Sequence, residues 1–169
     1  KVISFPNEYG RKQFDFYFKE LGNKAHKSHI DLIKLDFVVS AIDFLRFVSE
    51  EMLPKDIPGS TPFKVPLSIV RNGREYNKSF ELIKPLRKEN IYELRIDFDK
   101  ADVDTPFDWH FRIIFFPFVY EGDLFHCFVF PFHKTPQVKR NLTDFYRDKA
   151  SSIYYDLQNN PEKYGHCFK

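Results

Sequence analysis

The sequence predicts a single α+β domain, in which an N-terminal strand and a helical hairpin precede a twisted antiparallel sheet and a C-terminal helix. Three observations lead to this fold class. Apolar residues recur at helical spacing in the first part of the chain, alternate with polar residues in the later half, and return to helical spacing near the end. Consecutive strands bounded by helices are typical of an antiparallel sheet with helices packed against it.

Length and composition support one domain over residues 1–169. Of these 169 residues, 43% are hydrophobic and 30% are charged, so the chain can bury one sizeable core and is not disordered. Aromatic residues make up 18%, and runs such as Phe111–Phe118 are typical of buried strands. We therefore expect most of the aromatic residues in the core.

The first segments predict an edge strand and two helices. Val2–Phe5 is short and apolar, as an edge strand is. Arg11–Leu21 has helical spacing, and Gly22 predicts its end. Ser28 is a suitable N-cap for a second helix. The apolar stripe of that helix consists of Ile30, Ile33, Phe37, Ala41, Phe44, Leu45 and Val48.

Residues 54–80 are interpreted as an insertion before the sheet. Several prolines interrupt its beginning. Asn72–Gly73 is a turn dipeptide that separates two possible strands, Leu67–Val70 and Tyr76–Ile83.

The later half predicts three strands and a helix. Tyr92–Asp97 and Trp109–Phe115 alternate between apolar and polar residues, and Leu124–Phe130 follows as a third strand. Glu121–Gly122–Asp123 predicts a short hairpin connection between the second and third strands. An amphipathic segment predicts a C-terminal helix over residues 138–158.

Charge is unevenly distributed along the chain, although the formal net charge is only +2. Basic residues outnumber acidic ones between Lys64 and Lys88, acidic residues predominate from Glu89 to Asp108, and basic residues predominate again from Pro131 to Lys149. This pattern predicts a basic surface beside an acidic one. A solvated surface of mixed charge is the alternative.

The sequence predicts no cofactor and no metal site. Cys127 and Cys167 lack metal-binding spacing and are interpreted as reduced thiols. His26 and His29 have no completing ligand pattern, and the acidic segment Asp97–Asp104 lacks the glycine and glutamate of an EF-hand. No signal peptide or bilayer-spanning apolar run is evident, so we expect a cytoplasmic protein without a membrane partner.

Three motifs occur in a recognisable order. They are Lys84–Pro85–Leu86 leading to Tyr92–Ile96, then Phe111–Phe116, and finally Lys134–Thr135–Pro136. Together they resemble the RelE/HigB toxins of type II toxin–antitoxin systems, especially the phage-derived branch of the RelE/ParE superfamily. The resemblance covers Lys84–Lys149 and implies a RelE/ParE-like fold. Many members carry paired lysines before the last motif, where this chain has Phe130 and Pro131.

The resemblance also implies an activity and partners. Its reaction is endoribonuclease cleavage of mRNA, often on the ribosome, in which the RNA's own 2′-OH attacks the adjacent phosphate without a metal. An antitoxin protein would hold the toxin inactive. Two alternatives remain open. One alternative to the endoribonuclease is a toxin-like binding module without RNase activity, such as a gyrase inhibitor. The other is an interaction protein that uses exposed aromatic residues.

Four residues are candidates for this reaction. Arg112 and Arg95 carry guanidinium groups, which suit phosphate and its developing charge, and strand alternation places them on one face if their strands pair in register. His133 is a candidate for proton transfer, and Lys134 for holding phosphate, at the edge of the same face. Surface ion pairs for the arginines, and exposed loop positions for His133 and Lys134, are the structural alternatives.

Four further residues are candidates for contacts with RNA. These are Lys84, Lys88, His110 and Tyr146. His110 is also a second candidate for proton transfer, and Tyr146 could stack on a base or donate its hydroxyl. Packing within a hairpin for His110, and within the core for Tyr146, are the alternatives.

Overall fold

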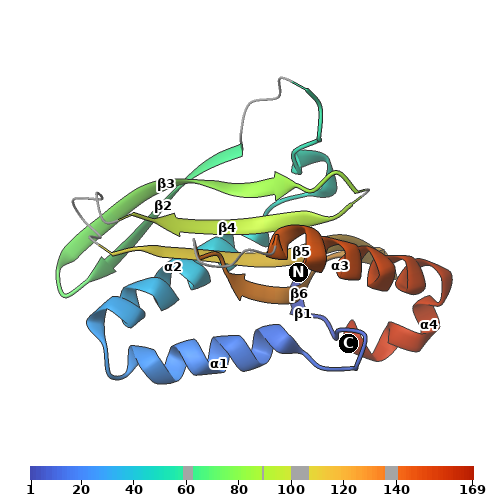
Figure 1. Cartoon of the computed structure of the whole chain (residues 1–169), viewed down its shortest axis with the longest axis horizontal. Coiled ribbons are helices and arrows are strands. Elements are labelled where there is room, and N and C mark those ends of the chain that lie inside the picture. Colours follow the sequence, from blue (N-terminus) through green and yellow to red (C-terminus); the bar gives the residue numbers. More distant parts are fainter. Residues whose placement is uncertain (59–62, 89, 100–106, 136–140) are drawn as a thin grey trace.

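The computed structural model describes residues 1–58, 63–88, 90–99, 107–135 and 141–169. Its centre is one six-stranded sheet in the order β1-β6-β5-β4-β3-β2 (Figure 1). The strands are β1 (Val2–Ser4), β2 (Phe63–Arg71), β3 (Arg74–Pro85), β4 (Tyr92–Phe98), β5 (Trp109–Tyr120) and β6 (Asp123–His133). The α+β class predicted from the sequence is therefore confirmed.

The sheet is mixed, which corrects the expectation of a wholly antiparallel one. β1 lies at one edge, as predicted, but it pairs with β6 in the parallel direction. The remaining neighbours pair antiparallel. A long helical connection separates β1 from the rest of the sheet, and such a connection permits a parallel pairing.

Two helices cover one face of the sheet. These are α1 (Gln13–Ala25) and α2 (His29–Leu45), both seen below the strands in Figure 1. Ser28 caps α2 as predicted, because its Oγ accepts a hydrogen bond from the backbone N–H of Asp31 at 3.3 Å. Gly22 does not end α1, which continues to Ala25. A glycine costs an exposed helix only about 1 kcal/mol, and packing of α1 against α2 and β6 outweighs this.

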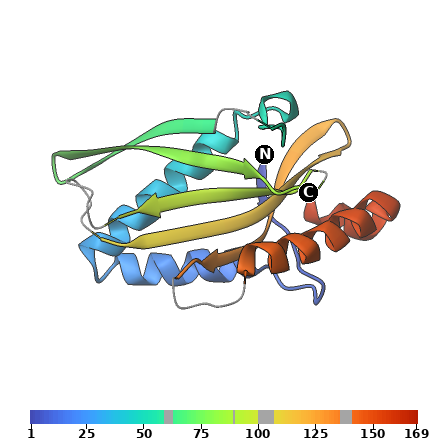
Figure 2. The ribbon, with the colours of Figure 1, turned by 45° about the horizontal axis from the view of Figure 1, so that its top comes forward.

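The other face is covered only in part. α3 (Leu142–Asn159) packs against β5 and β6 and leads into the short helix α4 (Pro161–Tyr164), as Figures 1 and 2 show. Residues 138–140, which were predicted to begin this helix, lie outside the described residues. α3 begins after Asn141, whose side chain accepts a hydrogen bond from the backbone N–H of Asp144. Beyond α3, exposed residues alternate with buried ones along β2 and along much of β3.

The β2–β3 hairpin, which begins within the predicted insertion and continues to Pro85, is part of the main sheet. β2 and β3 are joined through Asn72 and Gly73, both at positive φ, as the turn dipeptide predicted. β3 then pairs with β4, which extends the predicted three-strand meander into one continuous sheet. Arg71 at the end of β2 forms an ion pair with Asp36 of α2, with Nη2 donating to Oδ1 at 2.6 Å. The hairpin is therefore fixed to the helical layer.

Two apolar clusters hold these layers together. The larger one lies between the sheet and the α1–α2 layer, where Phe37 packs edge-on against Phe80 and Phe98. The smaller one lies under α3 and includes Phe116, Val129 and Phe130. Most aromatic rings are in these clusters, as expected from the sequence.

Candidate functional site

The strand register brings the two predicted arginines together. Arg95 of β4 is directly opposite Arg112 of β5, and the neighbouring residues Leu94, Ile96 and Phe111 point into the core on the helical side. Because side chains alternate along a strand, Arg95 and Arg112 share the face that α3 covers only in part. The same-face prediction is confirmed.

Arg112 is nevertheless almost fully buried and engaged in internal ion pairs. Its side chain is 3% exposed and is surrounded by two acids of β4. Nη1 lies 2.7 Å from Asp97 Oδ1, and Nη2 donates to Asp97 Oδ2 at 3.1 Å. Nε lies 2.7 Å from Glu93 Oε1, close enough for an ion pair but not aligned as a hydrogen bond. The phosphate contact expected for Arg112 is thus replaced by a buried internal ion-pair network.

The two acids of this network respond differently to burial. Burial raises the pKa of Glu93 above its ordinary value, and the positive charges of Arg112 and Arg95 oppose the rise only in part. Burial also acts to raise the pKa of Asp97. There the hydrogen bond and charge of Arg112, together with the hydrogen bond to His110, outweigh it and hold the pKa below its ordinary range. Asp97 is the firmly ionised member of the pair.

We expect the Glu93 carboxyl to titrate above the ordinary glutamate range in a carboxyl-detected NMR pH titration. Because its folded pKa is raised, the folded protein binds this proton more tightly than the unfolded chain does. Glu93 therefore contributes stability at low pH that is lost as the pH rises through its folded pKa. The substitution Arg112→Met removes a charge that lowers this pKa and should raise it further. A Glu93 resonance that titrates at the ordinary value, or that does not shift in Arg112→Met, would contradict this account.

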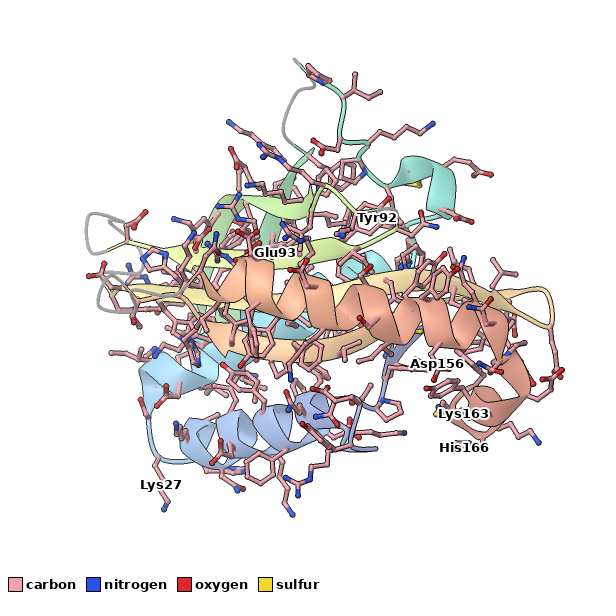
Figure 3. The ribbon with its side chains drawn as sticks, turned by 45° about the vertical axis from the view of Figure 1, so that its right-hand side comes forward. Lys27, Tyr92, Glu93, Asp156, Lys163 and His166 are labelled. Carbon is pink, nitrogen blue, oxygen red and sulfur yellow. The ribbon has the colours of Figure 1, made fainter. Side chains whose placement is uncertain are left out.

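A polar hollow of about 400 Å³ opens beside Glu93, between the β3–β4 end of the sheet and the start of α3. Figure 3 shows Glu93 beside the first part of α3. Lys27, between α1 and α2, lies far from Glu93 in the same view. We call this the basic hollow. Its charged lining comprises Lys84, Arg87, Arg95, Lys134 and Arg147 against Asp56, Glu93 and Asp144.

Three cations of the basic hollow have no acidic partner in the part of the chain that the structure describes. These are Lys84, Arg87 and Lys134, whereas Arg147 is paired with Asp144 and Asp148. Lys84 is the cross-strand neighbour of Glu93, and the charges of Lys84 and Lys134 both act to lower the pKa of that acid. Unpaired cations that converge on a hollow make it a suitable site for an anion.

Arg95 borders the basic hollow and is less constrained than Arg112. Its Nη1 donates to Glu81 Oε2 at 3.3 Å, and its Nη2 lies 3.7 Å from Asp97 Oδ2. Its side chain is 22% exposed, so its guanidinium can exchange these long contacts for a phosphate.

His110 lies in a second hollow that continues from the first. This hollow, of about 460 Å³, shares Arg95 and Lys134 with the basic hollow. His110 Nδ1 lies 2.8 Å from Asp97 Oδ1, and the imidazole is about one-third exposed. With Nδ1 protonated and donating to Asp97, Nε2 carries a lone pair and can accept a proton. His110 is therefore better placed for proton transfer than for packing.

The predicted position of His133 is wrong. The register pairs His133 with Phe111, so the imidazole lies on the helical side of the sheet, where it packs against Tyr17, Trp109 and Phe111. A β-bulge between Ile114 and Phe115 shifts the pairing of β5 with β6 by one residue, and no local sequence pattern indicates this bulge. His133 is thus separated by the sheet from Arg95 and Arg112.

Of the remaining residues predicted to contact RNA or phosphate, two line the basic hollow and two do not. Lys134 and Lys84 line the basic hollow, whereas Lys88 is exposed on the β3–β4 connection and is not part of the lining. Tyr146 is half-buried, with its ring stacked on Phe130 at a centroid distance of 5.0 Å, which is the core alternative.

Two residues that line the basic hollow, Arg87 and Arg147, were not among the site residues predicted from the sequence. Arg87 belongs to the basic stretch from Lys64 to Lys88, and this stretch was the only signal for it. Arg147 reaches the hollow from α3, and no sequence pattern linked this helix with β3 and β4.

Searches against protein-family models, curated proteins and solved structures gave no match. Among the helices that the structure describes, none combines the length and the apolar character needed to cross a bilayer. The two hollows and the residues that line them are therefore the features of the molecule that bear on function.

Proposed function

We propose that the protein is a toxin of the RelE/HigB type, an mRNA endoribonuclease that acts without a metal in the cytoplasm and is held inactive by an antitoxin. One observation carries the proposal: Lys84, Arg87 and Lys134, which lack acidic partners among the described residues, converge on an open hollow beside His110 and Arg95. Phosphate contacts provide most of the affinity of such sites for nucleic acid.

The proposed reaction needs only groups that the chain supplies. The RNA 2′-oxygen forms a bond to the neighbouring phosphorus, the bond from phosphorus to the 5′-oxygen breaks, and the products are a 2′,3′-cyclic phosphate and a 5′-hydroxyl end. His110 Nε2 takes the 2′-OH proton, and a proton from solvent or His110 completes the leaving hydroxyl. Arg95 and Lys134 stabilise the charge that develops on the phosphoryl oxygens. The phosphate contact that the sequence led us to expect from Arg112 is thus assigned to Arg95 in this proposal, while Arg112 orients Asp97.

The double substitution Lys84→Ala with Lys134→Ala tests the hollow directly. Binding of a single-stranded mRNA fragment is measured against salt concentration, and each lost phosphate contact should reduce the slope of log affinity against log salt by about 0.7. We expect weaker binding, a slope smaller by about 1.4, and loss of mRNA cleavage in the presence of ribosomes. The matched control is Lys19→Ala with Lys27→Ala, two exposed lysines of the α1 region. Equal effects in both double variants would contradict the proposal.

A second candidate function is a toxin-like binding module without RNase activity, such as a gyrase inhibitor. It is favoured by the burial of Arg112 in its ion pairs with Glu93 and Asp97. Transcripts that remain intact with purified protein and ribosomes, combined with growth arrest that persists in the Lys84→Ala, Lys134→Ala variant, would select this function instead.

A further inference from the structure

The β4 and β5 strands bring three potential metal ligands together at one end of their pairing. Asp99 follows β4, Asp108 precedes β5, and His110 is the second residue of β5. One ligand atom from each lies within 4.8 Å of the others. We infer that Asp99, Asp108 and His110 bind a divalent transition-metal ion, and that the bound ion inhibits RNA cleavage. The inhibitory part rests on the function proposed above.

The strand register explains why these residues meet. Phe98 pairs with Trp109 and Asp97 pairs with His110, so Asp99 and Asp108 lie side by side just beyond the last pair of the ladder. His110 Nε2 lies 3.8 Å from Asp99 Oδ1. Zinc bonds to imidazole nitrogen and carboxylate oxygen are about 2.0–2.2 Å long, so one ion can reach both atoms.

A fourth residue holds His110 in the orientation that a metal ligand needs. Asp97 is not one of the three ligands, but its Oδ1 lies 2.8 Å from His110 Nδ1. A metal-binding histidine almost always donates its second N–H to a carboxylate or carbonyl, which fixes the tautomer and turns the other nitrogen toward the metal. Asp97 is itself held by the buried Arg112, so this orientation is built into the core of the sheet.

The ligand set favours a particular class of ion. Imidazole with carboxylates suits Zn²⁺ and similar transition metals, whereas Mg²⁺ and Ca²⁺ prefer sites made only of oxygen. The two carboxylates of the set, Asp99 and Asp108, carry the two negative charges that match a divalent ion. Three protein ligands leave a fourth position for water, as in an open rather than a closed site.

Metal binding and proton transfer need the same lone pair. An ion on His110 Nε2 occupies the electrons that would accept the 2′-OH proton, so cleavage stops while the ion is bound. Zinc would thus act as an inhibitor of a reaction that itself needs no metal. No metal site was expected from the sequence, because no local spacing motif joins residues that come from the ends of two strands.

The test is a zinc titration of the chelator-treated, full-length protein by calorimetry, with mRNA cleavage measured separately in the presence and absence of ZnCl₂. We expect one zinc ion per chain in the wild type, with affinity reduced at least about tenfold in Asp108→Asn and in His110→Ala. Asp108 is exposed, so Asp108→Asn should fold normally and should cleave RNA without being inhibited by zinc. The control is His26→Ala, which removes an exposed histidine outside the set and should bind zinc as the wild type does.

Each outcome decides one part of the inference. Absence of zinc binding, or an equal loss of affinity in His26→Ala, would overturn the metal site. Zinc that binds at Asp108 and His110 but leaves wild-type cleavage unchanged would overturn the inhibition alone. Should the wild type cleave no RNA under any condition, the proposed function fails, while the calorimetric titration still decides whether the site binds zinc.

Discussion

The substitution Arg112→Met is expected to lower the free energy of unfolding by about 3–5 kcal/mol, because it removes one partner of a buried ion-pair network. Arg112 is 3% exposed, and Glu93, which is buried beside it, would lose its closest positive charge. Asp97 would lose its strongest hydrogen-bonding partner as well. The methionine side chain can fill much of the arginine's volume, so the change tests charge rather than packing.

Chemical denaturation at neutral pH measures this effect. Arg46→Met is a suitable control because Arg46 forms an exposed i,i+3 pair with Asp43, and exposed pairs contribute about 0–1 kcal/mol. The substitution Glu93→Gln removes the acid that Arg112→Met would leave unpaired. The double variant should therefore lose less free energy of unfolding than the two single variants lose together. If Arg112→Met lowers the free energy of unfolding no more than Arg46→Met does, Arg112 does not have the proposed internal role.

The substitution His110→Gln is expected to reduce the cleavage rate about 10²–10⁴-fold, the usual contribution of a positioned proton-transfer group. Glutamine can still donate a hydrogen bond toward Asp97, but it cannot accept and release the 2′-OH proton. Since the cations of the basic hollow are unchanged, affinity for the mRNA fragment should stay close to that of the wild type. Single-turnover cleavage and equilibrium binding measure the two quantities separately.

The control is His26→Gln, which alters an exposed histidine of the α1 region and should cleave at the wild-type rate. Products from the wild type should carry 2′,3′-cyclic phosphate ends. If His110→Gln cleaves as fast as the wild type, another group transfers the proton and the role proposed for His110 is wrong.

Much of the fold follows from local sequence patterns. Ser28 marked the start of α2, Asn72–Gly73 marked a hairpin turn, and alternation along Tyr92–Asp97 marked β4. These features depend on backbone conformation and on which side chains face the core, and both are properties of a few consecutive residues. The parallel pairing of β1 and the extension of the sheet by β2 and β3 depend on contacts between distant segments, and no local pattern encodes them.

The alternation of Arg95 with core residues on β4, and of Arg112 with core residues on β5, is a local property of the chain, and it allows both arginines to share one face. The contacts that each arginine makes depend on the packing of the whole sheet. The register places Glu93 and Asp97 around Arg112 and buries it, leaves Lys84, Arg87 and Lys134 facing a hollow, and turns His133 to the opposite side. Residue type sets which charges a chain carries. Strand register, a single bulge and the partial cover by α3 set which of those charges neutralise one another and which remain for a ligand.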